Sequence, residues 1–477
     1  MAKSKTVYIC QGCGIEHSKW QGQCIQCGEW NTLVETVVAG KSPKPKDVQI
    51  GKMGGKVYVL SEVKAVKGVK RRLEVGSREL SQVLGGGLVR GSGVLLAGEP
   101  GIGKSTLLSQ STLFFASKHG KVLYVCGEES VEQVKMRLER LIGYKKTSKA
   151  AQRQIMLMPE TDVDVVIGII EQENPSLVIV DSIQAMVTTD LAGMAGSVGQ
   201  VRESGNRLLN VCKRANIPLY IVGHVTKGGA IAGPKVLEHM VDVVVELTGE
   251  RMGRFRLLRT VKNRFGPTDE VGVYEMSDAG LVEVTDASKA FLEESQRGVA
   301  GSVVVALMEG TRVMLTEVQA LVTPSQLVVP RRVAEGVGVQ RVQLLAAVLT
   351  KSCRLGLSGS DIFVKVTGGL KVLEPAADLG IALAIASSFI NIALPKKSIA
   401  VGEVGLLGEV RQVAGLKKRL GEARKMGFTQ VMTPEKYKRL NQVVSKYLRG
   451  TAGSKAKHTT RQARRGESTR GGSIGRG

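Results

Sequence analysis

Gly98-Glu99-Pro100-Gly101-Ile102-Gly103-Lys104-Ser105 is the stretch that decides the fold of this chain. It has the spacing G-x-x-x-x-G-K-S. In such a loop backbone N–H groups curl around phosphates, the lysine reaches the β- and γ-phosphates, and the hydroxyl holds Mg²⁺. The apolar run Gly93–Ala97 before it predicts a buried strand, and Ser105–Gln110 predicts the start of a helix whose dipole favours phosphate. We therefore predict that residues 98–106, ending at Thr106, bind ATP with Mg²⁺. The alternative is a glycine-rich turn without a ligand.

Apolar runs alternate with helical stretches from about residue 71 to residue 285. Strands are expected at Val122–Val125, Leu177–Val180, Leu219–Val222 and Val241–Leu247, and helices at 130–142 and 200–215. Continuous apolar strands that alternate with helices indicate a mostly parallel sheet covered on both faces.

The chain of 477 residues is too long for one core, and about three domains are expected. The first half is expected to contain a cysteine module at 1–35, a Lys- and Gly-rich linker at 36–70 and an ATP-binding α/β domain at 71–285. A linker at 286–299 is expected to lead to a second α/β-looking unit at 300–448, with an apolar helix at Leu379–Ala386. The basic tail at 449–477 is expected to be disordered.

The net charge of +24 argues for a polyanionic partner, with nucleic acid first and a membrane surface second. The alternative is a basic tail that only aids solubility. No run approaches the roughly 18 apolar residues of a membrane helix, and no apolar signal region follows Met1. We therefore expect a cytoplasmic protein without a membrane partner.

Four of the seven cysteines form two C-x-x-C pairs, Cys10 with Cys13 and Cys24 with Cys27. Each pair makes a tight turn that points two thiolates at one ion, and two such turns make a closed tetrahedral site suited to Zn²⁺. A closed site predicts a structural zinc ion, with redox chemistry by a single C-x-x-C as the alternative. The three scattered cysteines are expected to be small buried side chains: Cys126, Cys212 and Cys353.

Two carboxylates are candidates for the ATP chemistry. Asp181 ends the apolar run that starts at Leu177, and a carboxylate there can hold Mg²⁺ through water. Glu128 follows the preceding strand and could polarise the attacking water, with a solvated position near a helix start as the alternative.

The Leu84–Gly91 stretch, the phosphate loop and the strand end at Glu128 resemble a RecA-type ATPase core. Together with the cysteine module, Lys262-Asn263-Arg264-Phe265-Gly266 resembles the RadA (Sms) family of bacterial DNA-repair proteins. The resemblance covers about residues 7–448. It implies an α/β fold in which a small zinc ribbon precedes a RecA-like core.

The resemblance also implies roles for single residues. Glu128 matches the catalytic carboxylate and Asp181 the aspartate that supports Mg²⁺. Lys262 and Arg264 match cations that reach the ATP of a neighbouring subunit in a ring, where they would neutralise charge on the γ-phosphate. From composition alone these two cations could equally belong to a solvated basic hairpin.

In RecA-like folds two loops face a central channel and touch DNA. By this resemblance they lie here at about 188–199 and 224–235, where Lys227 and Lys235 could bind phosphates without reading bases. His224 resembles the position that senses the γ-phosphate and passes the signal to the second loop.

Residues 300–448 resemble the proteolytic domain of the Lon protease, an α+β domain with a serine nucleophile activated by lysine. Lys417 is at the lysine position, but Asp378 stands where the serine is expected, and Ser387 and Ser388 lie outside the motif. A carboxylate cannot perform serine-type acyl transfer, so a non-proteolytic scaffold is expected. Arg331 and Arg332 are candidates for DNA contact or ordinary surface arginines.

The resulting hypothesis is an Mg²⁺- and ATP-dependent DNA motor for recombination and repair, with helicase-like movement. The resemblance implies a homo-oligomeric ring, expected to be a hexamer, that moves on single-stranded and branched DNA beside a RecA-type recombinase. Two alternatives stay open. One is an ATP-dependent Lon-like protease, and the other is a RecA-like switch ATPase without DNA.

Overall fold

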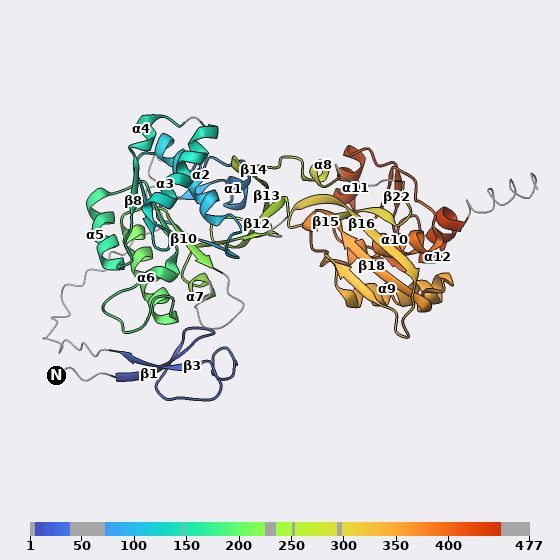
Figure 1. Ribbon diagram of the computed structural model, residues 1–477, viewed down its shortest axis with the longest axis horizontal. Coiled ribbons are helices and arrows are strands. Elements are labelled where there is room, and N and C mark those ends of the chain that lie inside the picture. Colours follow the sequence, from blue (N-terminus) through green and yellow to red (C-terminus); the bar gives the residue numbers. More distant parts are fainter. Residues whose placement is uncertain are drawn as a thin grey trace, which may run out of the picture. The chain divides into compact units, whose positions relative to one another are not determined.

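The computed structural model describes residues 5–38, 72–145, 147–224, 235–249, 253–292 and 298–449, and the chain divides into two compact units, Met1–Glu283 and Val284–Gly477 (Figure 1). The predicted tail after Arg449 and nearly all of the predicted 36–70 linker lie outside these described residues. Across the described ranges, no helix is long and apolar enough to cross a membrane.

The N-terminal module is a three-stranded antiparallel sheet in the order β2-β1-β3. Its strands are β1 Lys5–Cys10, β2 Glu16–His17 and β3 Leu33–Val38. Among its described residues, the buried cluster within the module has three members, Cys10, Cys24 and Leu33, while Val7 and Ile9 of β1 are buried in a core of the following domain. A core this small needs another source of stability.

A nine-stranded sheet organises the rest of the first unit, in the order β14-β13-β12-β11-β6-β10-β9-β7-β8. The parallel strands are β6 Gly93–Gly98, β7 Val122–Cys126, β8 Ile155–Met158, β9 Leu177–Asp181, β10 Leu219–His224 and β11 Val243–Thr248. An antiparallel extension follows, made of β12 Phe255–Asn263, β13 Val271–Ser277 and β14 Gly280–Glu283. A small separate pair joins β4 Arg72–Leu73 to β5 Leu88–Val89. The predicted mostly parallel sheet is therefore confirmed.

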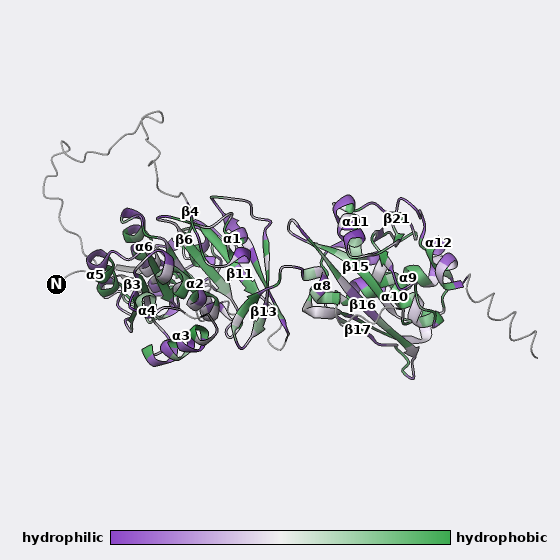
Figure 2. Ribbon diagram, turned by 90° about the horizontal axis from the view of Figure 1, so that it is seen from above, coloured by the Kyte–Doolittle hydropathy of each residue, from purple (hydrophilic) through white to green (hydrophobic). Residues whose placement is uncertain are grey.

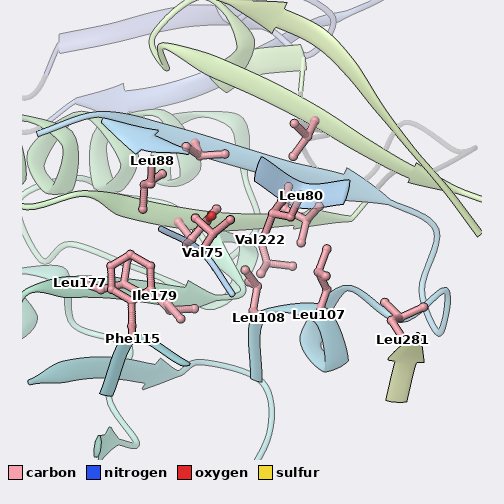
Figure 3. Packing of buried hydrophobic residues seen from close by; sticks show 14 of the residues in the cluster. Val75, Leu80, Leu88, Leu107, Leu108, Phe115, Leu177, Ile179, Val222 and Leu281 are labelled. Atoms are coloured by element: carbon pink, nitrogen blue, oxygen red, sulfur yellow. The ribbon is translucent and has the colours of Figure 1, made fainter. Parts of the chain in front are cut away.

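Both faces of the parallel part of this sheet are covered, and alternate residues of its strands enter different cores. In β6, Val94 and Leu96 join one core and Leu95 joins the other. The first core includes α1 Arg78–Val83, α2 Lys104–Lys118 and α3 Val131–Lys145, and Figure 3 shows its side chains around Leu108 and Phe115. The second includes α5 Val163–Glu173, α6 Val198–Arg214 and α7 Lys235–Glu238. Figure 2 shows apolar strands around β6 and β11 and polar residues on α3 and α6. A short α4, Lys149–Gln152, precedes β8.

The second unit has a six-stranded mixed sheet in the order β17-β18-β16-β15-β19-β22. Its strands are β15 Ser302–Glu309, β16 Arg312–Pro324, β17 Arg332–Glu335, β18 Ser360–Val366, β19 Ser398–Ala400 and β22 Gln430–Met432, with a hairpin of β20 Glu403–Val404 and β21 Val410–Arg411. Its helices are α8 Ala287–Leu292, α9 Val339–Cys353, α10 Asp378–Ile390, α11 Leu416–Lys425 and α12 Leu440–Val444. The predicted apolar helix is α10, and it is buried from Asp378 to Ser387.

The predicted linker at 286–299 differs in the structure. Residues 287–292 form α8, and Phe291 and Leu292 are buried. Leu292 belongs to a core of the second unit, so this part is an element of that unit and not a joint. Residues 293–297 lie outside the described part of the chain. Within α8, the charged residue Lys289 is exposed while Phe291 and Leu292 are buried, as in a short amphipathic helix.

Candidate functional site

The four N-terminal cysteines converge as the spacing predicted. All four Sγ atoms lie within 4.8 Å of one another, with Cys10 Sγ 3.5 Å from Cys27 Sγ and Cys13 Sγ 3.6 Å from Cys24 Sγ. A tetrahedral site with Zn–S bonds of about 2.3 Å requires Sγ–Sγ distances of roughly 3.8 Å. The residues therefore fit a structural zinc ion.

The turns that present these thiols need glycine. Gly14 N–H donates to the Cys10 carbonyl and Gly28 N–H to the Cys24 carbonyl, both at 2.8 Å. Both glycines have φ angles near +70°, at 74° and 72°. A residue with a Cβ is strained in this left-handed region, so each turn closes most easily with glycine.

The phosphate loop joins β6 to α2 through two glycines that a larger residue could not replace. Gly98 has φ +157°, and a Cβ there would meet the Leu247 carbonyl oxygen at 2.6 Å. Gly103 has φ +116° and immediately precedes α2. The loop thus has the glycine-dependent backbone shape that a phosphate cradle requires.

Lys104 is almost fully buried, with 3% of its surface exposed. Its Nζ donates to the carbonyl oxygens of Gly98 and Glu99, both at 2.9 Å, and lies 3.0 Å from His224 Nδ1. Burial lowers the pKa of Lys104 to about 8, although the nearby carboxylates oppose this shift. The ammonium group is held inside the loop by partners that phosphate oxygens can replace.

His224 connects this lysine to the first candidate carboxylate. Its Nε2 lies 3.1 Å from Glu128 Oε2, and Ser182 Oγ donates to Glu128 Oε1. Since Nδ1 faces the Lys104 ammonium, Nε2 carries the proton that Glu128 accepts. The hydrogen bond from His224 holds the pKa of Glu128 below its ordinary value, with Ser182 adding to the effect. Glu128 is thus an ionised, oriented carboxylate.

The second candidate carboxylate, Asp181, is buried at the end of β9. The Tyr124 hydroxyl donates to Asp181 Oδ2 at 2.6 Å. Strand order explains why these groups meet. In the register of the sheet His224 pairs with Gly98, and Asp181 pairs with Cys126. The carboxyl ends of four parallel strands therefore form one crevice, the usual ligand position in such sheets.

Lys262 and Arg264 lie at the opposite edge of this sheet. Lys262 pairs with Val244, and Val244 pairs with Leu95, three residues before Gly98. At about 3.3 Å per residue, roughly 10 Å of strand separate this register position from the start of the phosphate loop. The chain runs further away from the loop after Lys262, so neither cation reaches its own phosphate loop.

In this position both cations have partners within their own chain. Lys262 Nζ donates to the carbonyl oxygens of Glu238 and Val241, at 2.6 and 2.8 Å. Arg264 Nη1 lies 3.2 Å from Asp242 Oδ1. Burial lowers the pKa of Lys262, and the charge of Arg264 adds to this effect. These groups are therefore oriented, unlike a freely solvated basic hairpin.

The structure brings together the two stretches that carry the family resemblance, 84–91 and 262–266. The Arg72 guanidinium donates to the Leu84 carbonyl at 3.0 Å and to the Phe265 carbonyl at 2.5 Å. The two stretches are thus held together by one arginine, although they lie far apart in the sequence.

The first predicted DNA loop, 188–199, is anchored at its base. The Gln200 side chain accepts from the Thr188 N–H and donates to the Thr188 and Leu191 carbonyls, at 2.8, 3.1 and 2.7 Å. Its tip includes Met194, which is 85% exposed. Most of the second loop, 225–234 with Lys227, lies outside the described residues, and Lys235 is exposed at the start of α7.

In the second unit Asp378 is buried at the start of α10, with Oδ1 3.3 Å from Arg341 Nε. Burial raises the pKa of Asp378 to about 6, although Arg341 opposes this shift. Ser387 and Ser388 accept hydrogen bonds from backbone N–H groups, and Lys417 is exposed on α11.

The two arginines proposed for DNA contact differ in their surroundings. Arg332 donates to the Ser360 and Leu357 carbonyls, at 2.5 and 3.1 Å, so its side chain is held against the backbone around the start of β18. Arg331 is exposed and remains a candidate.

Sequence reasoning missed four polar residues near these sites. Tyr124, Ser182 and Gln200 contact Asp181, Glu128 and the 188–199 loop, and His17 Nε2 lies 3.4 Å from Cys24 Sγ. One signal was available for Tyr124, because a hydroxyl inside an otherwise apolar buried strand needs a partner. The other three have no signal in the sequence alone.

Three family matches cover different parts of the chain. Residues 8–35 match a rubredoxin metal-binding domain, residues 61–230 an AAA domain, and residues 342–437 the ChlI subunit of Mg-chelatase. They confirm the zinc ribbon and the ATPase core, and they agree with structural zinc, ATP and Mg²⁺ as cofactors. A crystal structure of the RadB recombinase aligns with 44% of this chain and 99% of its own, at 23% identity and a TM-score of 0.36.

Relatives match nearly the full length. DNA repair protein RadA of Bacillus subtilis is 46% identical over 91% of this chain and 93% of its own. The protein of the same name from Pseudomonas aeruginosa is 47% identical over 91% and 94%, and that from Brucella abortus is 44% identical over 91% and 92%. The resemblance read from the sequence is confirmed, and the chain belongs to the RadA family of DNA repair proteins.

Proposed function

We propose that this protein is an Mg²⁺- and ATP-dependent DNA motor of recombination and repair. It hydrolyses ATP while it moves on single-stranded DNA and extends or processes branched intermediates. The observation that carries the proposal is the continuous contact from Lys104 through His224 to Glu128 and Ser182, at the strand ends that lead into two loops.

In this proposal residues 98–106 hold the phosphates of ATP, and Lys104 exchanges its carbonyl partners for phosphate oxygens. Mg²⁺, when bound, would neutralise negative charge on the β- and γ-phosphates. Ser105 and Asp181 are the residues that would hold it, directly and through water. Glu128 orients and polarises the attacking water, since its pKa stays low and its geometry is fixed by two hydrogen bonds.

Lys262 and Arg264 act on the ATP of a neighbouring subunit. Their position at the far edge of the sheet supports this role, because they cannot serve their own phosphate loop. A cation supplied by the next subunit requires a head-to-tail contact, and such contacts form a ring when the rotation between subunits closes. We propose a hexamer.

DNA would pass through the ring along the loops 188–199 and 224–235. The net charge of +24 supports a polyanionic partner, and loop lysines would grip phosphates without reading sequence. His224 would couple ATP to the second loop, which begins directly after it. A RecA-type recombinase would work on the same DNA, in the bacterial cytoplasm.

The test is steady-state ATP turnover with and without single-stranded DNA over a salt series, with Lys104→Ala as the inactive control. We expect DNA to stimulate turnover and the stimulation to fall steeply with salt, as phosphate contacts require. Turnover that is unaffected by DNA at low salt would favour the switch-ATPase alternative.

A second candidate, an ATP-dependent protease, is disfavoured by Asp378. This residue is a buried carboxylate beside Arg341 at the position expected for a nucleophile, and Lys417 is exposed on α11. We expect no degradation of unfolded casein with or without ATP. Degradation that disappears in Lys417→Ala would restore the protease hypothesis.

A further inference from the structure

Tyr124 is a polar-tipped residue buried within a strand that is otherwise apolar. It lies in β7, whose five residues are all buried, and its side chain is completely inaccessible. Its hydroxyl donates to Asp181 Oδ2 at 2.6 Å, across 57 residues of sequence. A buried hydroxyl needs one good partner, and here that partner is the carboxylate at the phosphate crevice.

The chemistry of the two groups fixes the direction of this hydrogen bond. The phenol O–H of Tyr124 donates, and Asp181 Oδ2 accepts. An ionised carboxylate only accepts hydrogen bonds. Asp181 Oδ2 is therefore committed to Tyr124.

The other carboxylate at the crevice is held by a separate set of donors. Glu128 accepts from Ser182 and His224. Since the two carboxylates do not share a donor, the orientation of Asp181 depends on Tyr124 and not on the state of Glu128.

We propose that Tyr124 is a positioning residue that fixes the rotation of the Asp181 carboxylate for Mg²⁺ bound through water. This inference rests on the proposed role of Asp181 in the ATP site. Outer partners of this kind orient metal ligands, and their removal commonly costs on the order of tenfold in metal affinity. Tyr124 itself touches neither the nucleotide nor the metal.

The experiment measures binding of a fluorescent ATP analogue to the full-length protein as Mg²⁺ is titrated, with an EDTA baseline. Tyr124→Phe keeps the ring and removes only the hydroxyl. We expect the half-saturating Mg²⁺ concentration to rise about tenfold, with nucleotide binding in EDTA unchanged. ATP turnover need not be measured.

Tyr220→Phe is the matched control. Tyr220 is buried in β10, which β9 separates from β7, and its hydroxyl has no hydrogen-bond partner among the described residues. Removing it deletes the same atom from the same core without touching Asp181. We expect an unchanged Mg²⁺ requirement. An equal shift in both variants would overturn the inference, because it would trace the effect to core packing.

Asp181→Ala separates this inference from the proposed function. If Asp181→Ala leaves the Mg²⁺ requirement unchanged, the proposed role of Asp181 fails. If Asp181→Ala shifts it and Tyr124→Phe does not, only the inference about Tyr124 fails. In the double variant we expect no shift beyond that of Asp181→Ala, since Tyr124 acts through Asp181. Loss of the fold in Tyr124→Phe alone, with Tyr220→Phe folded, would show a structural role and would also overturn the inference.

Discussion

At the scale of single residues, the sites depend on charged groups that are buried before any ligand arrives. Lys104 is held by loop carbonyls and His224. Asp378 is a buried carboxylate beside Arg341. In both residues burial opposes the charged form, and the two pKa values move in opposite directions because one group is a cation and the other an anion.

The first prediction concerns the pH dependence of ATP binding. Burial lowers the pKa of Lys104 to about 8 in the free protein. Below that pH the ammonium is present for the phosphates, and above it the lysine loses its charge. We expect ATP affinity to be constant below pH 8 and to fall by up to about tenfold per pH unit above it. Fluorescent nucleotide binding between pH 7 and 9.5 measures this.

Lys104→Arg is the control for this measurement. Arginine stays charged throughout this range. The Lys104→Arg protein should therefore bind ATP more weakly than wild type, but its affinity should not fall above pH 8. Wild-type binding that does not change between pH 7 and 9.5 would contradict the interpretation of the buried lysine.

The second prediction concerns the pH dependence of stability at Asp378. Its pKa is raised from 3.8 to about 6 in the folded protein. Between these values the folded state binds more protons than the unfolded state, so the contribution of Asp378 to stability declines as the pH rises from about 4 to 6. Asparagine does not titrate, so the Tm of Asp378→Asn minus the Tm of wild type should increase as the pH rises from about 4 to 6.

Asp361→Asn provides a control of opposite sign. Asp361 accepts from the Arg331 N–H, which holds the pKa of Asp361 below its ordinary value. Its contribution to stability is present at neutral pH and is lost as the pH falls. The Tm of Asp361→Asn minus the Tm of wild type should therefore decrease as the pH rises. Parallel pH trends in the two variants would argue against the assignment.

At the scale of elements, the zinc ribbon is the part least able to fold alone. Among its described residues, its internal buried cluster has three members, and two of them are metal-ligand cysteines. The parallel part of the nine-stranded sheet, by contrast, has a separate core on each face. The two elements should therefore differ sharply in their dependence on metal.

The third prediction follows from this difference. We expect one Zn²⁺ per chain, and we expect Cys10→Ser or strong chelation to unfold the ribbon while ATP binding to the sheet domain survives. Metal analysis combined with nucleotide binding measures both effects.

Cys353→Ser is the control, since Cys353 is a buried cysteine of α9 outside the ribbon. It should retain zinc. Absence of zinc from wild-type protein purified without chelator would disprove the metal assignment.

At the scale of the whole molecule, each ATP site in the proposed ring combines the phosphate loop of one chain with Lys262 and Arg264 of the next. The register of the sheet separates these groups within a chain by roughly 10 Å of strand. Hydrolysis should therefore report contact between subunits.

The fourth prediction is complementation between inactive subunits. Lys104→Ala and Lys262→Ala rings should each lack ATPase activity. In an equal mixture, an active site needs an intact loop from one subunit and an intact cation from its neighbour, and each is present about half of the time. The mixture should therefore recover roughly a quarter of the wild-type sites. The measurement is ATP turnover after co-assembly has been verified.

A mixture of Lys104→Ala with Glu128→Gln is the matched control, because both residues lie in one chain's crevice and no rescue is expected. If the first mixture gains no more activity than the second, the cations do not act between subunits.

The sequence by itself determined what depends on contiguous residues. The phosphate loop, the paired cysteines and the alternation of apolar strands with helices are local patterns, since each follows from backbone conformation or side-chain periodicity over a few residues. The strands β6, β7, β9, β10 and β11 therefore lie where the apolar runs predicted them, and the four thiols meet.

Only the tertiary structure decided which distant residues meet. Tyr124 reaches Asp181 because β7 and β9 are neighbours, and His224 lies beside Lys104 because β10 pairs with β6. Residues 287–292 form a helix and not a linker because a partly apolar segment becomes stable once a sheet covers its apolar side. Strand order and burial are set by the free energy of the whole core, so no local stretch of sequence specifies them.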